Sequence, residues 1–252
     1  MGNDVNLGND PFKAMTSVVT GGGSGIGAAT ARVLQAGGAR VLVLDIQENP
    51  DFETILTDLR QTESFPEITK SIRKILGHID ILVNAAGISK PAELSALSKE
   101  SYRDTQLVNL ESPIFLMKFI GSQMCQRGFG RIVNVSSVHG SRSELTSLSY
   151  DTSKAGLEAA TRTAALEYAR YGVLVNCVAP GFVNTQMSIV NGTNELDTEW
   201  FQNTYISNHR LPLLRAADAQ EIAQLIAWLS SKKNTYITGQ SITIDGGLSI
   251  GI

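Results

Sequence analysis

The stretch SVVTGGGSGIG, residues 17–27, decides the fold of this chain. A short apolar run ends at Thr20, glycine occupies five of the next seven positions, and a helix-like stretch follows. Glycine permits positive φ and close backbone approach, and a helix N-terminus offers unpaired N–H groups with the positive end of the helix dipole. A strand, a glycine-rich turn and a helix in this order predict a cradle for phosphate groups. The predicted contacts are Gly21, Ser24, Gly25, Ile26 and Gly27.

The second predicted strand, residues 40–45, ends in Asp45. This acid lies about twenty residues beyond the glycine-rich turn, where a carboxylate can accept hydrogen bonds from both hydroxyls of an adenosine ribose. A carboxylate there would also repel a 2′-phosphate, so the sequence favours NAD over NADP as cofactor. Ile46 is included with Asp45 in the predicted cofactor site. The alternative is that Asp45 is an ordinary polar residue at the end of a strand.

The segment YDTSK, residues 150–154, places a phenol and an ammonium group one helical turn apart on the same face. A free tyrosine loses its proton near pH ~10, so Tyr150 can exchange a proton with an alcohol at neutral pH only if its phenolate is stabilised. Lys154 can supply that stabilisation. A pair with this spacing also occurs by chance on exposed helices, so its catalytic interpretation depends on the other motifs.

Seven short apolar segments are predicted as strands, and helical patterns separate most of them. They span residues 16–20, 40–45, 54–57, 79–84, 130–136, 173–178 and 241–244. This alternation predicts a single-domain α/β fold, with a doubly wound parallel sheet of seven strands and helices on both faces. Only about nine residues separate Asp45 from Ile55, whereas a parallel crossover normally needs a dozen or more, so a loop or a single turn is expected there. The expected organisation is a flexible tail at residues 1–12 and one domain at residues 13–252.

Composition agrees with one large domain, because 252 residues with 42% apolar content can bury a sizeable core. The net charge of −3 and the lack of a basic cluster argue against nucleic acid as a partner. No apolar run approaches the ~18 residues of a membrane span, and residues 1–10 lack the apolar core of a secretory signal. A cytoplasmic protein without a membrane partner is therefore expected. Cys125 and Cys177 are far apart, and no metal site is predicted.

Taken together, the motifs resemble those of the short-chain dehydrogenase/reductase family, in its classical subgroup, from about residue 13 to residue 248. Residues 20–27 resemble the TGxxxGxG turn, residues 84–87 the NNAG element with alanine at its second position, and residues 180–185 the PGxVxT segment. The resemblance implies a Rossmann-like domain that binds a nicotinamide cofactor. It adds the following residues to the cofactor site: Asp58, Leu59, Asn84, Ala85, Ala86, Gly87, Tyr150, Lys154, Pro180, Gly181, Val183 and Thr185.

The same resemblance implies a catalytic set made of Asn109, Ser137, Tyr150 and Lys154. Ser137 would hydrogen-bond the substrate oxygen, Tyr150 would exchange the hydroxyl proton, and Lys154 would favour the phenolate and contact the nicotinamide ribose. Asn109 would connect Lys154 to solvent through ordered water. Ser137 is preferred over Ser136 because it lies thirteen residues before Tyr150, as in the family. Ser136 would then be a buried hydroxyl that satisfies backbone groups.

Substrate recognition is expected from residues 184–215 and from the loop at residues 138–149, which would close over the nicotinamide. The first segment is either an amphipathic lid over an apolar or cyclic substrate or a helix packed against the main body. The residues concerned are Met187, Ile189, Val190, Trp200, Phe201 and Tyr205. In the second segment His139 is expected in a solvated loop, with substrate contact as the alternative. Arg142 and Glu144 are expected as solvated loop charges, or as groups that recognise a carboxylate or polyol hydroxyls.

These observations predict an NAD-dependent oxidoreductase that interconverts a secondary alcohol, a cyclic or polyhydroxylated one included, and its ketone. One alternative is a 3-oxoacyl-thioester reductase; such enzymes commonly use NADPH, which Asp45 without a nearby arginine argues against. The other is a non-catalytic NAD-binding protein on the same fold, which the complete catalytic set argues against. Classical members of the family are often tetramers, so a homotetramer is expected, with interfaces from residues 105–124, 149–168 and 242–252. The alternative is that the same apolar stripes face the sheet.

Overall fold

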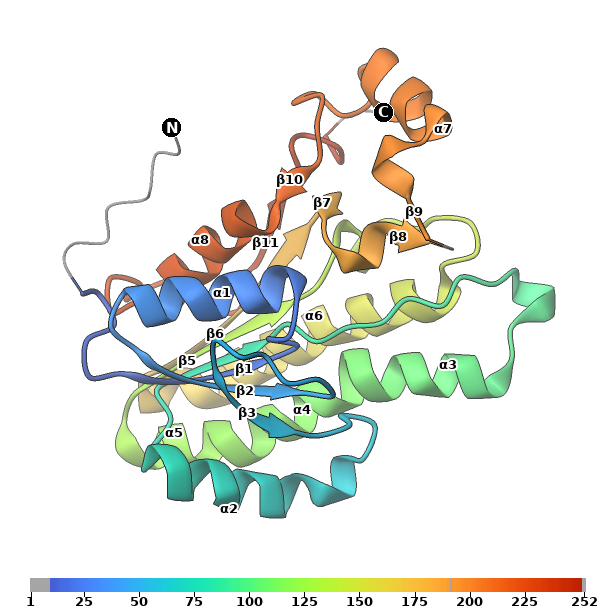
Figure 1. Cartoon of the computed structure of the whole chain (residues 1–252). Helices are drawn as coiled ribbons and strands as arrows, with labels where there is room; N and C mark the ends of the chain where they lie inside the picture. Colours follow the sequence, from blue (N-terminus) through green and yellow to red (C-terminus); the bar gives the residue numbers. More distant parts are fainter. Residues whose placement is uncertain (1–9, 191, 251–252) are drawn as a thin grey trace.

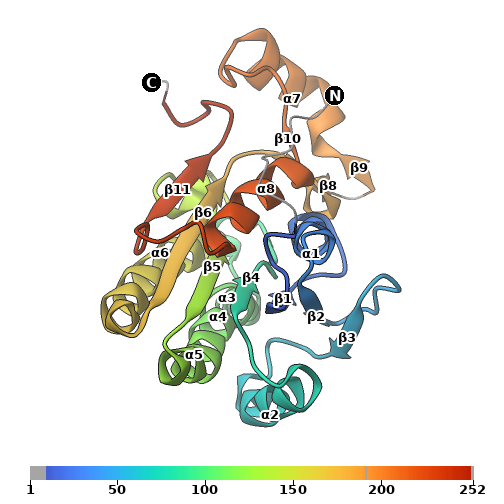
Figure 2. The same cartoon turned by 90° about the vertical axis from the view of Figure 1, so that its left-hand side faces the viewer.

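A parallel sheet of seven strands forms the centre of the molecule, with helices on both faces (Figures 1 and 2). The computed structural model describes residues 10–190 and 192–250. The strand order is β11-β6-β5-β4-β1-β2-β3. The strands are β1 (Thr16–Thr20), β2 (Arg40–Asp45), β3 (Glu53–Leu56), β4 (Ile81–Asn84), β5 (Gly130–Val135), β6 (Val173–Pro180) and β11 (Ser241–Ile244). The predicted doubly wound fold is confirmed, and every strand lies within two residues of its predicted bounds.

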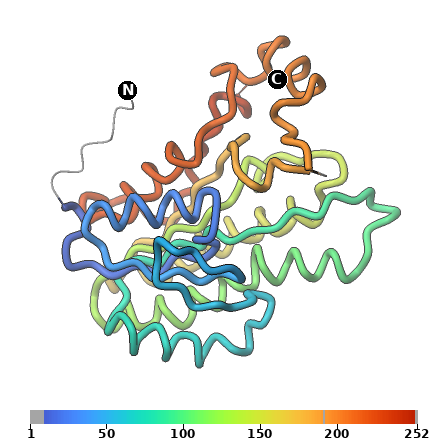
Figure 3. Tube along the Cα trace, in the orientation of Figure 1, coloured from blue at the N-terminus to red at the C-terminus, as the bar shows by residue number. Residues whose placement is uncertain are grey.

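Two layers of helices cover the sheet. On one face lie α1 (Gly25–Ala36) and α8 (Ala219–Ser230); on the other lie α2 (Phe65–Leu76), α6 (Leu148–Tyr168) and a long helical rod (Figure 2). The rod runs through α3 (Lys99–Gln106), a π-helical segment (Leu107–Glu111), α4 (Ser112–Leu116), a second π-helical segment (Met117–Gly121) and α5 (Ser122–Arg127). Figure 3 shows the rod as one continuous helical path.

The core divides into two apolar clusters, one on each face of the sheet. Successive strand side chains point to opposite faces, so Val19 and Val43 join the cluster under α1 and α8 while Val18 and Leu42 join the cluster over α2 and α6. A sheet covered on both faces needs strands that are apolar throughout, which explains the continuous runs in the sequence. The helices contribute stripes instead; α2 buries Phe65, Thr69, Ile72 and Leu76 at helical spacing.

The connection between β2 and β3 contains no helix, as its length predicts. Asn49 organises this loop, because its Nδ2 donates to the Gly22 carbonyl oxygen (3.0 Å) and its Oδ1 accepts from the backbone nitrogen of Asp51 (3.1 Å). The loop is thereby packed against the glycine-rich turn.

The N-terminal boundary differs from the expected tail at residues 1–12. Residues 1–9 lie outside the described residues, but Phe12 is fully buried in the cluster under α1. The ring of Phe12 lies against Gly37, just beyond the end of α1, and the backbone nitrogen of Phe12 donates to the Gly37 carbonyl oxygen (2.8 Å). The packed part of the chain therefore includes Phe12.

Short elements fill the chain after β6. They are β7 (Val183–Asn184), which pairs with β10 (Ala217–Asp218), the antiparallel pair β8 (Ile189–Val190) and β9 (Thr193–Asn194), α7 (Glu199–Phe201) and a π-helical segment (Gln202–Ser207). Six 3-10 turns complete the described chain: Thr62–Ser64, Leu94–Ala96, η5 (Val138–Gly140), Ala169–Tyr171, Gln186–Ser188 and Glu195–Asp197. Figure 1 shows α7 standing away from the sheet, beyond the carboxyl ends of its strands.

Within residues 10–190 and 192–250, no helix combines the length and apolar character needed to cross a membrane. In the same part of the chain, no three His, Cys, Asp or Glu side chains are grouped so as to hold a metal ion. Cys125 lies half-buried on α5, and Cys177 is fully buried on β6. Both are free thiols.

Candidate active site

The parallel strands have their carboxyl ends at one edge of the sheet (Figure 1). Most of the predicted site residues stand at or just after these strand ends. Thr20, Asp45 and Asn84 end β1, β2 and β4, and Ser137 follows β5 by two residues. This edge of a doubly wound sheet is where ligands bind.

The glycine-rich turn is close-packed and leaves no room for side chains. Gly21 has a φ of 69°, and a Cβ added there would lie 2.7 Å from Ala86 Cα. A Cβ on Gly27 would collide with the Gly21 carbonyl oxygen. The first turn of α1 can therefore pack against the glycine-rich turn only if residue 27 is glycine. Thr20 Oγ1 accepts hydrogen bonds from the backbone nitrogens of Ala85 and Ala86, both at 3.1 Å. The turn and residues 84–87 are thereby joined into one surface.

The N-terminus of α1 fits an anionic ligand. Ser24 precedes the helix in an extended conformation but makes no side-chain capping bond, and the first turn contains no acid. The first N–H groups of a helix have no intrahelical partner, and the helix dipole favours negative charge there. A Cβ on Gly25 would lie only 3.3 Å from Thr185 Cγ2, so the segment after β6 approaches the same turn. The cradle therefore fits the pyrophosphate of a dinucleotide.

Asp45 lies against the glycine-rich turn. Its Oδ2 accepts from the backbone nitrogen of Gly23 (2.8 Å), and its Oδ1 accepts from that of Gln47 (3.1 Å). A carboxylate oxygen can accept more than one hydrogen bond, so these contacts leave capacity for ribose hydroxyls. Ile46, next to it, is exposed. The position agrees with the predicted adenosine pocket.

Asp58, which was expected in the cofactor site, has a partner that the sequence did not reveal. Arg60 Nη2 lies 2.6 Å from Asp58 Oδ2, and this bond and charge hold the pKa of Asp58 below its usual range. The same guanidinium lies 3.6 Å from Asp104 on α3, which also pairs with Lys90 (2.7 Å). Leu59 is buried in the core cluster over α2. Only the two-residue spacing of Asp58 and Arg60 hinted at this ion-pair network.

Ser137, Tyr150 and Lys154 lie together at the end of β5 and the start of α6. Burial raises the pKa of Tyr150 to about 12, a hydrogen bond with Ser137 acts in the opposite direction, and the negative charge of Asp151 adds to the rise. Burial also lowers the pKa of Lys154 to about 8. Lys154 Nζ lies 5.4 Å from the Tyr150 ring centroid and donates to the Val135 carbonyl oxygen (2.8 Å). The predicted shift of Tyr150 toward phenolate is thus reversed in this state, because burial dominates.

Ser136 and Asn109 make mainly structural contacts. Ser136 Oγ lies within hydrogen-bond distance of Glu158 Oε1 (3.1 Å) and the Lys154 carbonyl oxygen (3.3 Å), and its single proton can be donated to either. This environment matches the alternative of a buried structural hydroxyl. Asn109, in the first π-helical segment, binds the backbone of Ile88 through both its Oδ1 and its Nδ2, each at 2.9 Å. Its Nδ2 also donates to Ser153 Oγ (3.1 Å). Asn109 therefore fixes the chain after β4 to the helix that carries Tyr150.

The segments around Gly87 and Pro180 close the site from two sides. A Cβ on Gly87 would lie 3.6 Å from both Asn109 Oδ1 and Lys154 Nζ and 3.8 Å from Met187 Cε. Gly181 packs closely on Asp245, and Val183 belongs to the short β7 ladder. Of the segment after β6, Met187 reaches Gly87, which also lies beside Lys154 Nζ. Asn84 differs, because its buried side chain donates to Asn134 Oδ1 (2.7 Å) and links β4 to β5.

His139 was expected in a solvated loop, and this expectation is wrong. Its Nδ1 lies 2.6 Å from Asp151 Oδ1, its Nε2 lies 3.5 Å from Glu144 Oε2, and only 21% of its side chain is exposed. Arg142 is an exposed loop residue, as expected, and its Nη2 donates to the Ser249 carbonyl oxygen (2.7 Å). Asp151 was missed entirely, although it stands within the YDTSK segment.

Residues 184–215 divide between the two alternatives. Phe201 is 1% exposed and packs on Phe182 (ring centroids 4.9 Å) and Tyr205 (5.2 Å), in a third apolar cluster with Leu196 and Leu211. These residues are helix-packing contacts. Of the residues named for the lid, four have exposed side chains, as a lid requires: Met187, Ile189, Val190 and Trp200.

Comparisons with known proteins cover nearly the whole chain. A family model described as enoyl-(acyl carrier protein) reductase matches residues 21–249. The 3-oxoacyl-[acyl-carrier-protein] reductase of Thermotoga maritima is 35% identical over 246 residues, 92% of this chain and 97% of that protein. The cis-4-hydroxycyclohexanecarboxylate dehydrogenase of Sinomonas cyclohexanicum is 33% identical over 251 residues, 94% of this chain and 98% of that protein.

Solved structures show the same likeness. A gluconate 5-dehydrogenase from Burkholderia cenocepacia, in complex with NADP and tartrate, superposes with a TM-score of 0.89 at 26% identity, covering 98% of this chain and 99% of that one. The matched region includes both the glycine-rich turn and the segment from Ser137 to Lys154.

Proposed function

Because the chain belongs to the classical subgroup of the short-chain dehydrogenase/reductase family and is an oxidoreductase, we propose that it interconverts a secondary alcohol and its ketone with NAD as cofactor. The observation that carries the proposal is that Ser137, Tyr150 and Lys154 lie close together, with Lys154 beside Gly87. At the same edge of the sheet, Asp45 is hydrogen-bonded to the glycine-rich turn. An acid–base group, a charge partner and a dinucleotide site then share one edge of the sheet.

NAD, when bound, supplies the hydride acceptor for alcohol oxidation. The chain supplies position and proton transfer. The turn at Gly21 and the N-terminus of α1 would hold the pyrophosphate of the cofactor, and Asp45 would accept hydrogen bonds from the hydroxyls of its adenosine ribose. Ser137 hydrogen-bonds the substrate oxygen, and Tyr150 accepts the proton of the hydroxyl as the carbon-bound hydrogen leaves with its electron pair. In ketone reduction Tyr150 returns the proton to the oxygen.

Lys154 has a specific task in this scheme. Burial, partly offset by the hydrogen bond with Ser137 and reinforced by the charge of Asp151, raises the pKa of Tyr150 to about 12, so the phenolate needs a nearby positive charge to act as a base at neutral pH. Lys154, 5.4 Å from the phenol ring, is held by the Val135 carbonyl oxygen and can supply it. The positive charge that a bound oxidised nicotinamide brings adds to that of Lys154.

The proposed substrate is a cyclic or polyhydroxylated secondary alcohol. The exposed apolar side chains of residues 187–200 would cover an apolar ring, while the half-exposed carboxylate of Glu144 offers an acceptor for further hydroxyl groups. The printed names of the relatives support this class, because hydroxycyclohexanecarboxylate is cyclic and gluconate is polyhydroxylated.

A 3-oxoacyl-thioester reductase is the second candidate, because the reductase of Thermotoga maritima shares 35% identity with this chain. The carboxylate of Asp45 weighs against NADPH, the cofactor that this activity commonly uses. Arg60 does not offset it, since that guanidinium is engaged by Asp58 and Asp104.

Nicotinamide absorbance tests the proposal. The protein is incubated with NAD or NADP and a panel of secondary alcohols, polyols, cyclic diols and hydroxy acids, and with NADH or NADPH and 3-oxoacyl thioesters. Turnover with NAD and an alcohol is expected, together with its loss by at least ~100-fold in Tyr150→Phe and retained NAD binding in that variant. Preference for NADPH and thioesters would favour the second candidate. Normal turnover by Tyr150→Phe would contradict the mechanism.

We also propose a homotetramer in which the outer face of the rod and α6 forms an interface. Phe115 and Phe119 stack there beneath Lys118, Leu166 is 83% exposed, and a shallow hollow lies between α5 and Tyr171. An exposed apolar face of this kind favours association. Light scattering on the wild type and on Leu166→Glu tests the assignment: the variant should dissociate, and an unchanged mass would place the interface elsewhere.

A further inference from the structure

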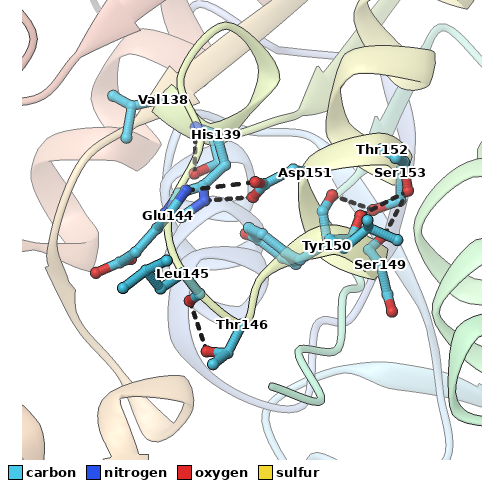
Figure 4. Close-up of polar contacts among 12 residues, drawn as sticks. Val138, His139, Glu144, Leu145, Thr146, Ser149, Tyr150, Asp151, Thr152 and Ser153 are labelled. Atoms are coloured by element: carbon cyan, nitrogen blue, oxygen red, sulfur yellow. Dashed lines mark hydrogen bonds and ion pairs between the residues drawn. The ribbon is translucent and has the colours of Figure 1, made fainter. Parts of the chain in front are cut away.

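His139, Asp151 and Glu144 form a charged cluster beside the phenol of Tyr150 (Figure 4). His139 belongs to η5, Glu144 to the loop that follows, and Asp151 to the first turn of α6. Asp151 Oδ1 lies 2.6 Å from His139 Nδ1, and Asp151 Oδ2 accepts a hydrogen bond from the backbone nitrogen of Glu144 (3.4 Å). Asp151 therefore ties the whole loop to the helix that carries Tyr150.

The geometry around the imidazole suits its charged form. Each ring nitrogen faces a carboxylate oxygen, Nδ1 toward Asp151 and Nε2 toward Glu144. The Asp151 contact is a hydrogen bond (2.6 Å), whereas Glu144 lies at an ion-pair distance (3.5 Å). A neutral imidazole has a single N–H and would leave one carboxylate facing a lone pair, whereas an imidazolium presents an N–H and a positive charge to both. The side chains of His139 and Asp151 are 21% and 14% exposed, so water screens this contact only in part.

Tyr150 lies within reach of this charge. The rings of His139 and Tyr150 are 5.5 Å apart, centroid to centroid, and meet edge to face at 77°. Asp151 is the next residue along the helix, and its negative charge adds to the burial that raises the pKa of Tyr150. A positive charge placed against Asp151 would offset this contribution.

We propose that His139 is a positioning residue for the acid–base step: held between Asp151 and Glu144, it carries a positive charge that neutralises Asp151 beside the reactive phenol. The inference rests on the proposed function in one respect, the role of Tyr150 as the acid–base group. It adds a second cation close to the Tyr150 ring, whose centroid lies 5.5 Å from that of His139 and 5.4 Å from Lys154 Nζ.

The other charged and titratable groups near the cluster either have hydrogen-bond partners of their own or face Glu144 rather than Asp151. On α6, Lys154 donates to the Val135 carbonyl oxygen, and Glu158 accepts from Ser136 and Ser241. In the loop, Arg142 binds the Ser249 carbonyl oxygen. From the segment after β9, Glu195 and Tyr205 face Glu144, whose charge contributes to the raised pKa of each, after burial. Among the residues that the structure describes, His139 is the cation that contacts Asp151.

The test compares His139→Gln, Asp151→Asn and the double variant with the wild type. Glutamine keeps an N–H donor but carries no charge, so His139→Gln leaves Asp151 uncompensated. The acid limb of the kcat profile for alcohol oxidation should move up by about one pH unit in His139→Gln and down in Asp151→Asn. The double variant should return close to the wild type, and His139→Arg, which keeps the charge, should lie nearer the wild type than His139→Gln.

His78→Gln is the matched control, because His78 also pairs with an aspartate, Asp80 at 3.2 Å, but lies before β4 at the opposite end of the sheet. Its profile should coincide with that of the wild type. NAD binding, measured by fluorescence, should be unchanged in every variant. Profiles of His139→Gln and the wild type that coincide would overturn the proposal.

A second readout needs no substrate and separates this inference from the proposed function. Tyrosine labelled at the ring carbon that bears the hydroxyl reports phenol ionisation by NMR, and the Tyr150 signal is the one absent from Tyr150→Phe. In the NAD-bound protein this signal should titrate at lowest pH in Asp151→Asn and at highest pH in His139→Gln. Equal titration in all variants, or no titration in Asp151→Asn below its alkaline unfolding, would contradict the role of His139 even if no alcohol is turned over.

Discussion

Asp45 shows how one residue serves both the architecture and the ligand. Its carboxylate holds the backbone nitrogens of Gly23 and Gln47 while its charge faces the expected ribose. Asp45→Asn keeps an oxygen acceptor for the turn but removes the charge. We expect NAD affinity to fall about tenfold, because a hydrogen bond to a charged group contributes more than a neutral one, and NADP to bind better than before. Titration calorimetry with both cofactors measures the change. Unaltered preference in Asp45→Asn, with the turn intact, would remove Asp45 from the specificity argument.

The buried Lys154 predicts a pH dependence of stability in the cofactor-free protein. Burial lowers the pKa of Lys154 from 10.5 to about 8, so between these values the unfolded chain binds more protons than the folded one. The free energy of unfolding should therefore rise with pH across that window. Tyr150, whose pKa is raised from 10.0 to about 12, acts in the opposite sense above pH 10. Urea unfolding at pH 8 and pH 10 tests the lysine contribution, which is on the order of 2 kcal/mol.

The matching variant is Lys154→Met, which keeps the volume of the side chain but does not titrate. Its unfolding free energy should change less between pH 8 and pH 10 than that of the wild type, and the difference between the two slopes is the contribution of Lys154. Parallel slopes would mean that Lys154 is not desolvated in the folded state.

At the scale of elements, the packing of α1 on the glycine-rich turn predicts the effect of a single methyl group. Gly27→Ala drives a Cβ into the Gly21 carbonyl oxygen and pushes the helix away from the phosphate cradle. We expect NAD affinity to fall about tenfold or more. Gly77→Ala is the control: Gly77 has a φ of 78° with no atom within 4 Å of an added Cβ. It should cost about 1 kcal/mol of stability and leave NAD binding unchanged. Similar NAD binding by both variants would contradict the cradle.

The cluster around α7 is separate from both main core clusters, so it should respond to mutation on its own. Phe201→Ala removes the ring that packs on Phe182 and Tyr205 and should destabilise residues 196–211 by about 3 kcal/mol. Hydrogen exchange of these amides should increase and KM should rise, with little change in the melting of the sheet. Trp200→Ala, at a 58% exposed neighbour, should cost about 1 kcal/mol or less. Uniform loss of stability across the chain in Phe201→Ala would show that the cluster is part of the main core.

For the whole molecule, the sequence predicted what depends on local pattern. Every strand of the sheet was found. The central strands are buried on both faces and rich in apolar residues, whereas the edge strands β3 and β11 are partly exposed and mix polar with apolar residues. The loop after β2 followed from chain length alone. The order of motifs also placed Gly21, Asp45 and Lys154 at one edge of the sheet, since parallel strands share their carboxyl ends.

Contacts between distant segments escaped prediction, since no local pattern encodes them. Arg60 binds Asp104, forty-four positions away, and Arg142 binds Ser249. His139 was expected in solvent, because its partner Asp151 is brought to it only when η5 packs on α6. The pKa of Tyr150 rises rather than falls for a similar reason, since burial is a property of the fold. These wrong or missing predictions concern charge and solvation, whereas the topology of the sheet could be predicted from the hydrophobic pattern.

The two cysteines give the molecule a single addressable thiol. Cys177 lies inside the sheet, and burial raises its pKa to about 12, so it is scarcely ionised at neutral pH. Cys125 is half-buried on α5, in the hollow beside Tyr168 and Tyr171. Burial raises the pKa of Cys125 as well, but its side chain is only partly covered. A maleimide should therefore react at Cys125 before Cys177, and because Cys125 lies on the face proposed to join subunits, assembly should slow that reaction and Leu166→Glu should restore it.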